Sequence, residues 1–273
     1  MAIRRLIGAL STLCVACWVA SGALAAEADT EALPWKTWEF ALGGFLMTHD
    51  ASVRVDSNTL GIGTEIDMEN DLGFDKNLET FRFDADWRFL PRHRVSFSIY
   101  DYSRDATRTI NREIQFGDET FLINTTIASE FDFTVYKASY AYSVIQNAKF
   151  DLGLSAGLHL MDIKTSIAVT GLGQSESAKV LAPLPVFGLR GTWAITPKLF
   201  LKGNLDVFAI TIDDISGRFA DALVALEYDA FEHVGFGVGY NRVYMNIEAD
   251  GDKFNGEVGA GFGAVLVYGK VFF

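Results

Sequence analysis

Alternation of apolar and other residues with a period of two is the feature that most restricts how this chain can fold. In residues 81–89 every odd position is apolar. The even positions between them are all charged: Arg82, Asp84, Asp86 and Arg88. Only an extended strand places successive side chains on opposite faces, so this segment has one apolar and one charged face. The same alternation returns in three further segments, 136–144, 150–160 and 199–207. The pattern predicts an all-β protein.

Strands of this kind suit either a soluble β-sandwich or a membrane barrel, because the apolar face can meet a protein core or lipid. The segments have the roughly 9 to 11 residues that a tilted transmembrane strand needs. No stretch beyond the first 25 residues contains 18 consecutive apolar residues, which excludes a helical membrane protein.

Short polar turns recur between the alternating segments. They lie at 90–93, 146–148, 196–198 and 231–233. Proline, asparagine and charged residues end strands there. The intervals between turns are roughly 35 to 56 residues long, enough for two strands and a longer loop. Four short turns on one side imply ten strands, with eight or twelve as alternatives, in an antiparallel up-and-down transmembrane β-barrel. Its long loops are expected at 50–77, 105–128, 163–179, 211–218 and 246–255.

Three tryptophans favour the barrel over the sandwich. Trp38, Trp87 and Trp193 fall on the apolar face, each near a short turn or near the start of the first strand. An interfacial aromatic girdle places tryptophans there, whereas a soluble core has no reason to collect them at one end.

The first residues have the parts of a secretory signal peptide. Arg4 and Arg5 are followed by an apolar run and by the cleavage motif Ala23-Leu24-Ala25. Cys14 and Cys17 lie inside this segment, so the mature chain has no cysteine. The alternative is a lipoprotein acylated at Cys17, although position 14 lacks the leucine expected for such a site.

The expected organisation is a signal peptide, residues 1–25, and one outer-membrane β-barrel, residues 26–273. Subtracting Arg4 and Arg5 from the 23 basic residues leaves 21 against 35 acidic residues, a formal charge of −14. We do not expect nucleic acid as a partner, because binding a polyanion needs basic patches.

Charges on the face opposite the apolar one would line the lumen. The alternation assigns seven basic residues to it: Arg82, Arg88, Arg94, Lys137, Arg190, Lys202 and Lys270. It also assigns seven acidic residues: Glu39, Asp84, Asp86, Asp151, Asp206, Asp221 and Glu227. Eight-stranded barrels are just filled by side chains, and ten strands make the lumen only slightly wider. Charges crowded there must be paired to offset desolvation. We expect an ion-pair network that largely fills the lumen.

A filled lumen predicts a structural or surface-interaction role in the cell envelope. The alternative is a narrow porin-like channel that carries small solutes past the same charges. A selective pore would more naturally have a surplus of one sign, which favours the filled barrel.

An enzyme is not expected. The pair Asp84 and Asp86 and the ten strands are similar to the omptin proteases, but those also need an Asp-x-His pair that no histidine here supplies. Ser155, His159 and Asp151 would project from one strand about 13 Å apart, which is too far for hydrogen bonding.

Neither a cofactor nor a metal is expected. Residues 250–256 begin like a calcium loop, but Phe254 occupies the third ligand position. The remaining candidate for divalent ions is the cluster Asp67, Glu69, Asn70 and Asp71.

The last strand resembles the C-terminal strand of bacterial outer-membrane proteins. It alternates toward a terminal Phe273, although Gly269 is smaller than that pattern usually shows. The resemblance implies that the barrel assembly machinery recognises Phe273.

Nearly the whole mature chain resembles small barrels of the OmpA/OmpW kind, and more closely a family of proteobacterial outer-membrane barrels of unknown function. The residues that carry this resemblance are 71–73, 91–94, 114–118, 157–159 and 182–185. It implies a monomer in the outer membrane of a Gram-negative bacterium, in contact with lipid and lipopolysaccharide, and it supplies no catalytic residues.

Overall fold

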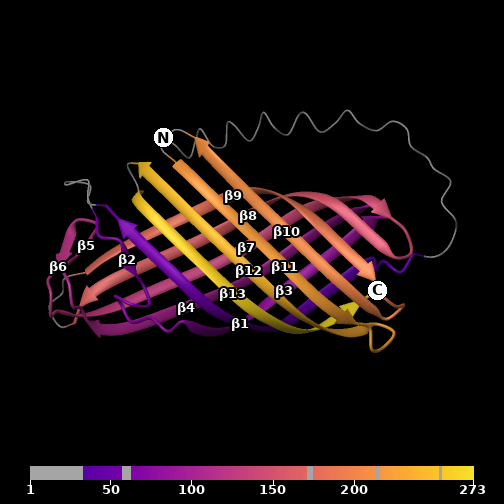
Figure 1. Cartoon of the computed structure of the whole chain (residues 1–273), viewed down its shortest axis with the longest axis horizontal. Helices are drawn as coiled ribbons and strands as arrows, with labels where there is room; N and C mark the ends of the chain where they lie inside the picture. Colours follow the sequence, from indigo (N-terminus) through magenta and orange to yellow (C-terminus); the bar gives the residue numbers. More distant parts are fainter. Residues whose placement is uncertain (1–32, 57–62, 171–174, 213–214, 252–253) are drawn as a thin grey trace. The chain divides into compact units, whose positions relative to one another are not determined.

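Ten long antiparallel strands close into a barrel (Figure 1). The computed structural model describes residues 33–56, 63–170, 175–212, 215–251 and 254–273, so the predicted signal peptide lies outside the described residues. The barrel strands are β1 (Trp38–Val55), β3 (Asn77–Leu90), β4 (His93–Thr109), β7 (Thr126–Gln146), β8 (Phe150–Val169), β9 (Ser175–Ala194), β10 (Leu199–Ile212), β11 (Ile215–Tyr228), β12 (Val234–Gly251) and β13 (Phe254–Phe272). Each pairs with its neighbours along the chain, and β13 pairs with β1 to close the ring. The predicted all-β ten-stranded barrel is confirmed.

Three short strands lie at one end of the barrel. Strand β2 (Ile66–Asp67) pairs with β1, and β5 (Ile114–Phe116) forms a separate hairpin with β6 (Glu119–Phe121). The four predicted short turns lie at the opposite end, with the start of β1 and the end of β13 (Figure 1). We call the half of the barrel with the short turns the proximal half and the other the distal half.

The distal strands are longer than predicted. The predicted loop 163–179 is mostly strand, because β8 continues to Val169 and β9 already begins at Ser175. The predicted loops 211–218 and 246–255 are likewise mostly strand. Their polar outward residues do not form a lipid-facing stripe, so the alternation of apolar residues does not predict these parts of the strands.

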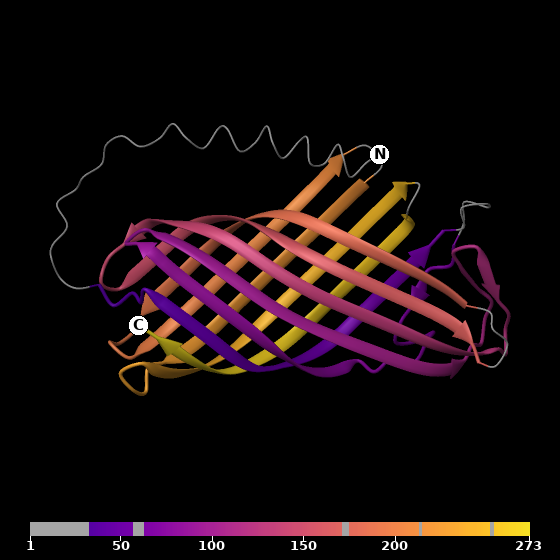
Figure 2. The same ribbon diagram turned by 180° about the vertical axis from the view of Figure 1, so that it is seen from behind.

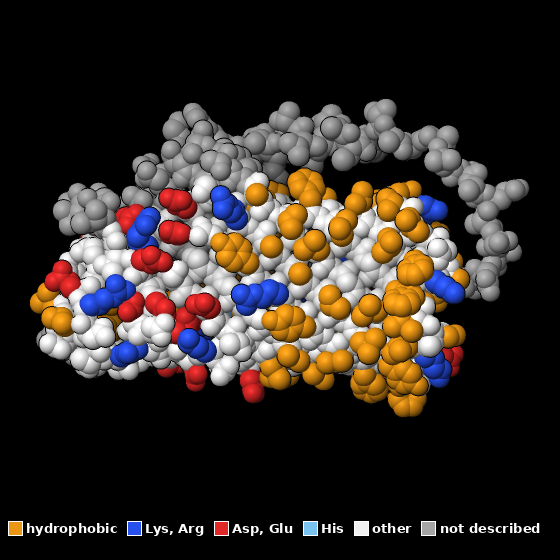
Figure 3. All heavy atoms as spheres, viewed as in Figure 1, with side chains coloured by type: hydrophobic (Ala, Val, Ile, Leu, Met, Phe, Trp, Pro, Cys, Tyr) orange, Lys and Arg blue, Asp and Glu red, His pale blue; other side chains and the backbone are white. Residues whose placement is uncertain are grey.

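The two halves of the barrel have opposite polarity. In proximal β7, Tyr136, Tyr140 and Tyr142 are exposed on the outer face, whereas in distal β7 the buried residues are Phe133 and Val135. On the face shown in Figure 3, hydrophobic side chains accordingly gather over the proximal half and charged ones over the distal half. The proximal exterior suits lipid and the distal exterior suits water.

The distal interior is an apolar core that reaches the end of the barrel. Inward residues of the strands, among them Phe45, Phe131 and Phe262, are at most 2 % exposed. Residues from the distal connections join them: Ile66, Met68, Leu72, Phe74, Ile110, Ile114, Phe116 and Phe121. The connections are held by backbone hydrogen bonds, such as Met68 N to Ala51 O (3.0 Å) and Gly117 N to Val55 O (3.0 Å). The described side chains of these connections therefore pack into the distal end of the barrel.

In the described part of the chain, no helix is both long enough and apolar enough to cross a membrane.

Candidate functional site: the charged lumen

The proximal lumen brings together all fourteen charged residues that the alternation assigned to it. Each is buried or half-buried, and each takes part in at least one ion pair. Period two fixes which face a side chain occupies, and the closed sheet turns that face inward.

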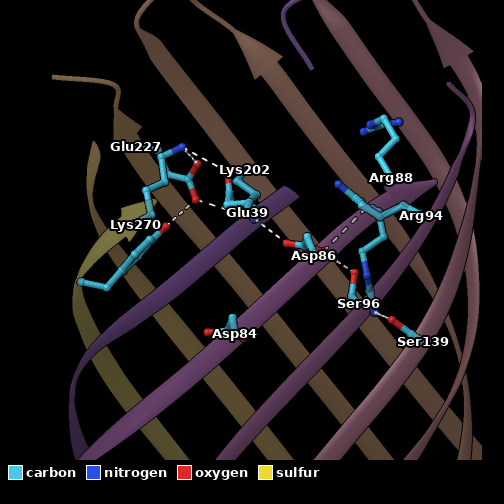
Figure 4. Close-up of polar contacts among 12 residues, drawn as sticks. Glu39, Asp84, Asp86, Arg88, Arg94, Ser96, Ser139, Lys202, Glu227 and Lys270 are labelled. Atoms are coloured by element: carbon cyan, nitrogen blue, oxygen red, sulfur yellow. Dashed lines mark hydrogen bonds and ion pairs between the residues drawn. The ribbon is translucent and has the colours of Figure 1, made fainter. Parts of the chain in front are cut away.

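Two lysines form the centre of the network nearest the short turns (Figure 4). Lys202 on β10 lies 2.7 Å from Glu39 and 3.2 Å from Asp86. Lys270 on β13 lies 3.3 Å from Glu39 and 2.6 Å from Glu227. Glu39 and Asp86 are direct cross-strand partners, an arrangement that is repulsive for two carboxylates. The ammonium of Lys202, from the opposite wall, offsets this repulsion.

A second group lies deeper in the barrel. The Arg82 guanidinium donates to both carboxylate oxygens of Asp84 (2.8 to 3.1 Å) and to Asn241 Oδ1 (3.0 Å). Asn241 Nδ2 donates to Asp221 (2.6 Å), which also pairs with Lys137. These contacts tie β3, β7, β11 and β12 together across the lumen.

Three arginines complete the network on the β4, β8 and β9 side. Arg88 pairs with Asp151, and Arg190 with Asp206 at 2.8 Å. Arg94 lies 3.9 Å from Asp86. Asp206 also lies 3.5 Å from His159 Nε2.

Several lumen residues were missed by the sequence analysis. Asp229 follows β11 and pairs with Lys36 (3.2 Å) and Lys270 (3.0 Å). Tyr268 donates its hydroxyl to Glu227 (2.6 Å). The same alternation places Tyr268 and Asn241 on the inward face. The prediction from sequence was limited to charged residues and therefore did not include them. Lys36 and Asp229 lie outside the strands, where alternation gives no information.

Two small cavities lie in the proximal lumen. A cavity of about 70 Å³ is lined by the network around Arg82 and Lys202, and a second of about 50 Å³ lies toward Trp35 and Lys36. Such cavities hold a few waters, whereas small-molecule sites occupy about 300–1,000 Å³.

The three predicted girdle tryptophans lie on the proximal outer surface. Trp38, Trp87 and Trp193 are 38 to 43 % exposed. Trp38 stacks on Trp87 with ring centroids 5.0 Å apart, and Trp193 stacks on Phe150 at 5.9 Å.

The C-terminal residue takes part in closing the barrel. Phe273 N donates to Trp38 O (2.9 Å), and Phe273 O accepts from Thr37 N (2.8 Å). Its ring stacks on His233 with centroids 5.2 Å apart.

The acidic cluster of the first distal connection is satisfied by the protein itself. Glu69 pairs with Arg104 at 2.7 Å, and Asp71 pairs with Arg112. Asp67 accepts hydrogen bonds from Asn70. Among the residues with described positions, no group of acidic, histidine or cysteine residues has the arrangement of a metal site.

No family model matches the chain, and no curated protein matches it in sequence. Among solved structures, the outer-membrane protease OmpT of Escherichia coli is similar with a TM-score of 0.56 and 11 % identity, over 90 % of this chain and 100 % of OmpT. The fold is that of an outer-membrane β-barrel. Ail of Yersinia pestis has a TM-score of 0.35 and 12 % identity, over 88 % of this chain and 100 % of Ail, too low to carry an argument.

The fold and the exterior together locate this barrel in the bacterial outer membrane. All ten barrel strands contribute exposed aromatic or aliphatic side chains, and such a surface requires lipid. The likeness to barrels of the OmpA/OmpW kind remains a prediction, as does the closer likeness to a proteobacterial barrel family of unknown function.

Proposed function

We propose that this protein is a non-conducting outer-membrane barrel with a structural or surface-interaction role. The proposal rests on two groups of packed side chains that follow one another along the lumen, which we call the proximal and the distal seal. Paired charges fill the proximal half, and an apolar core fills the distal half.

The first seal follows from the energetics of buried charge. Removing one member of a buried ion pair leaves an uncompensated charge, so the network resists any rearrangement that would open a path. Its balance of seven basic and seven acidic predicted residues also provides no field to select one ion.

The distal half that contains the second seal also extends beyond the membrane. Strands β7, β8 and β9 have 20 or 21 residues, whereas about 9–11 cross a membrane. The excess forms a distal barrel whose polar exterior and apolar core are those of a water-soluble domain. We infer that this projecting part presents a rigid surface outside the membrane, near lipopolysaccharide, and that the protein works as a monomer.

Planar-bilayer conductance tests the double seal. We expect near-zero steady current from the unmodified protein. Arg82→Ala with Lys202→Ala weakens only the proximal seal, and Phe116→Ser with Phe121→Ser weakens only the distal one. Because the seals act in series, each pair alone should leave the current low, and only the quadruple variant should conduct. A stable open conductance in the unmodified barrel would favour the alternative.

That alternative is a narrow porin-like channel. It is supported by the two polar cavities, which lie along the proximal lumen. It requires the distal core to move aside. Current in the variant that carries only the Phe116 and Phe121 substitutions, with the proximal network intact, would therefore identify the distal core as the plug of a channel.

We propose that the protein is not an enzyme, although OmpT is described as a protease. Asp84 is paired with Arg82 inside the proximal lumen, and Asp86 with Lys202. His159 is 1 % exposed, and His93 and His233 lie at the short turns. Hydrolysis of a peptide library at a rate abolished by Asp84→Ala would contradict this proposal.

A further inference from the structure

The barrel wall is unpaired along part of one strand junction. Strands β9 and β10 pair only from Phe200 with Ala194 to Val207 with Phe187. Beyond that point the described residues of the two strands form no further pair. We call this stretch, residues 175–186 of β9 and 208–212 of β10, the seam. Each of its edges still pairs on the other side, β9 with β8 and β10 with β11, and the two strands run apart toward the distal end (Figure 2).

Two prolines lie on the β9 edge of the seam. The β8–β9 ladder runs unbroken through Pro183 and Pro185, which pair with Leu160 and Leu158. An unbroken ladder needs the amide donors on that side, so the nitrogens of both prolines face the seam. Proline has no amide hydrogen and is confined to strand edges for this reason. The prolines therefore prevent β10 from extending its pairing and prevent a foreign strand from docking in register.

The β9 edge of the seam begins inside the lipid-facing belt. The outward residues beyond Phe187 are Pro185, Pro183 and Leu181, and only then comes the charged Lys179. Phe187 is 61 % exposed and Leu181 57 %. The inward residues beside them are also apolar: Leu184, Val186 and Phe208. The seam is thus bounded by apolar side chains on both faces at the level of hydrocarbon.

We propose that the β9–β10 seam is a lateral groove that binds the acyl chain of an outer-leaflet lipid. Hydrocarbon is the solvent at this level of the belt and complements the apolar edges. A peptide strand is disfavoured because the two prolines remove the donors that β-augmentation needs. Phospholipid and lipid A share the acyl-chain chemistry, so the experiment must separate them.

Disulfide trapping tests whether the seam is open. The mature chain is predicted to lack cysteine, so a double variant has one possible pair. Leu189→Cys with Leu205→Cys lies in the paired part of the junction. Leu184→Cys with Ile210→Cys leaves both prolines in place and would occupy directly opposed positions, five residues further, if pairing continued. We expect oxidation in outer-membrane fractions to link the first pair almost completely and the second pair at least tenfold less. Equal linking would overturn the proposal.

Photo-crosslinking tests the occupant. A benzophenone amino acid replaces Leu184, an inward residue at the seam, or Leu223, an inward residue that pairs on both sides. Their exposures are matched at 6 % and 8 %. We expect a lipid adduct at position 184 only. Mass spectrometry identifies phospholipid or lipid A, and vesicles of phospholipid alone show whether phospholipid suffices. An adduct at neither position or at both overturns acyl-chain binding, and the disulfide result decides independently if a benzophenone variant does not assemble.

Discussion

Val135 and Tyr136 are neighbours on β7, yet Val135 is fully buried and Tyr136 is 41 % exposed. At this level the inner and outer faces of the barrel exchange polarity, while the same residues of the alternation continue to face inward. Toward the short turns the outward residues of β7 are tyrosines, and toward the distal end the inward residues are aliphatic and aromatic. The same exchange separates exposed Leu46 from buried Met47 on β1. This level marks where lipid gives way to water as the outer solvent.

A carboxylate on the inner face of distal β7 should therefore cost far more stability than one on its outer face. Val135→Asp buries an unpaired charge in the distal core and should lower the free energy of unfolding by about 3 kcal/mol or more. Thr134→Asp, on the outer face of the same strand, should change it little. The folded fraction after stepwise urea treatment in detergent measures both. Similar losses in the two variants would show that the distal half has no packed core.

The ion-pair partner of Arg88 comes from a strand that is not adjacent to β3. It pairs with Asp151 on β8, while Asp86 is held by Lys202 and Arg94. Arg88→Ala should destabilise the barrel by about 3–5 kcal/mol because Asp151, 4 % exposed, loses its counter-charge. Removing both charges in Arg88→Ala with Asp151→Ala should recover most of the loss. Urea unfolding of the two single variants and the double variant gives the coupling, and additive losses would deny the pair.

The C-terminal residue should matter for assembly more than for export. Deleting Phe273 removes the backbone hydrogen bonds with Thr37 and Trp38 that close β13 against the start of the chain. We expect the folded protein in the outer membrane to fall several-fold while the periplasmic precursor is still exported. Phe273→Tyr keeps the backbone and an aromatic ring and serves as the control. Normal surface levels of the truncated chain would remove Phe273 from the assembly signal.

A closed barrel should resist unfolding by detergent until it is boiled. The proximal parts of all ten strands pair on both sides, and β13 pairs with β1 over residues 39–55, so most backbone groups bond within the sheet. We expect unboiled protein to migrate faster than boiled protein on a denaturing gel. A chain in which Leu42→Pro breaks the β1 ladder should lose that difference. Identical mobility of boiled and unboiled unmodified protein would contradict a closed barrel.

Much of this fold was visible in the sequence because alternation and turns are local properties. The segment 81–89 alone shows which side chains share a face, and the turns at 90–93 and 146–148 limit the order of strands. The inward charges were assigned in the same way. The exchange of polarity is also visible locally, since Val135 and Tyr136 are consecutive apolar residues on opposite faces. A prediction based on a single lipid-facing stripe does not detect it.

Tertiary structure alone decided which residues meet. Lys202 reaches Glu39 across the lumen although 163 residues separate them, and the distance depends on strand register and on the curvature of the closed sheet. The seam depends on the same register. Pro183 and Pro185 are plain in the sequence, but only the ladder shows that their nitrogens face β10 and not β8. The sequence by itself determined faces and strands, because these follow from backbone geometry one residue at a time. The ion-pair partners, the distal core and the seam depend on the register and curvature of the whole sheet. These bring together residues that no local pattern relates.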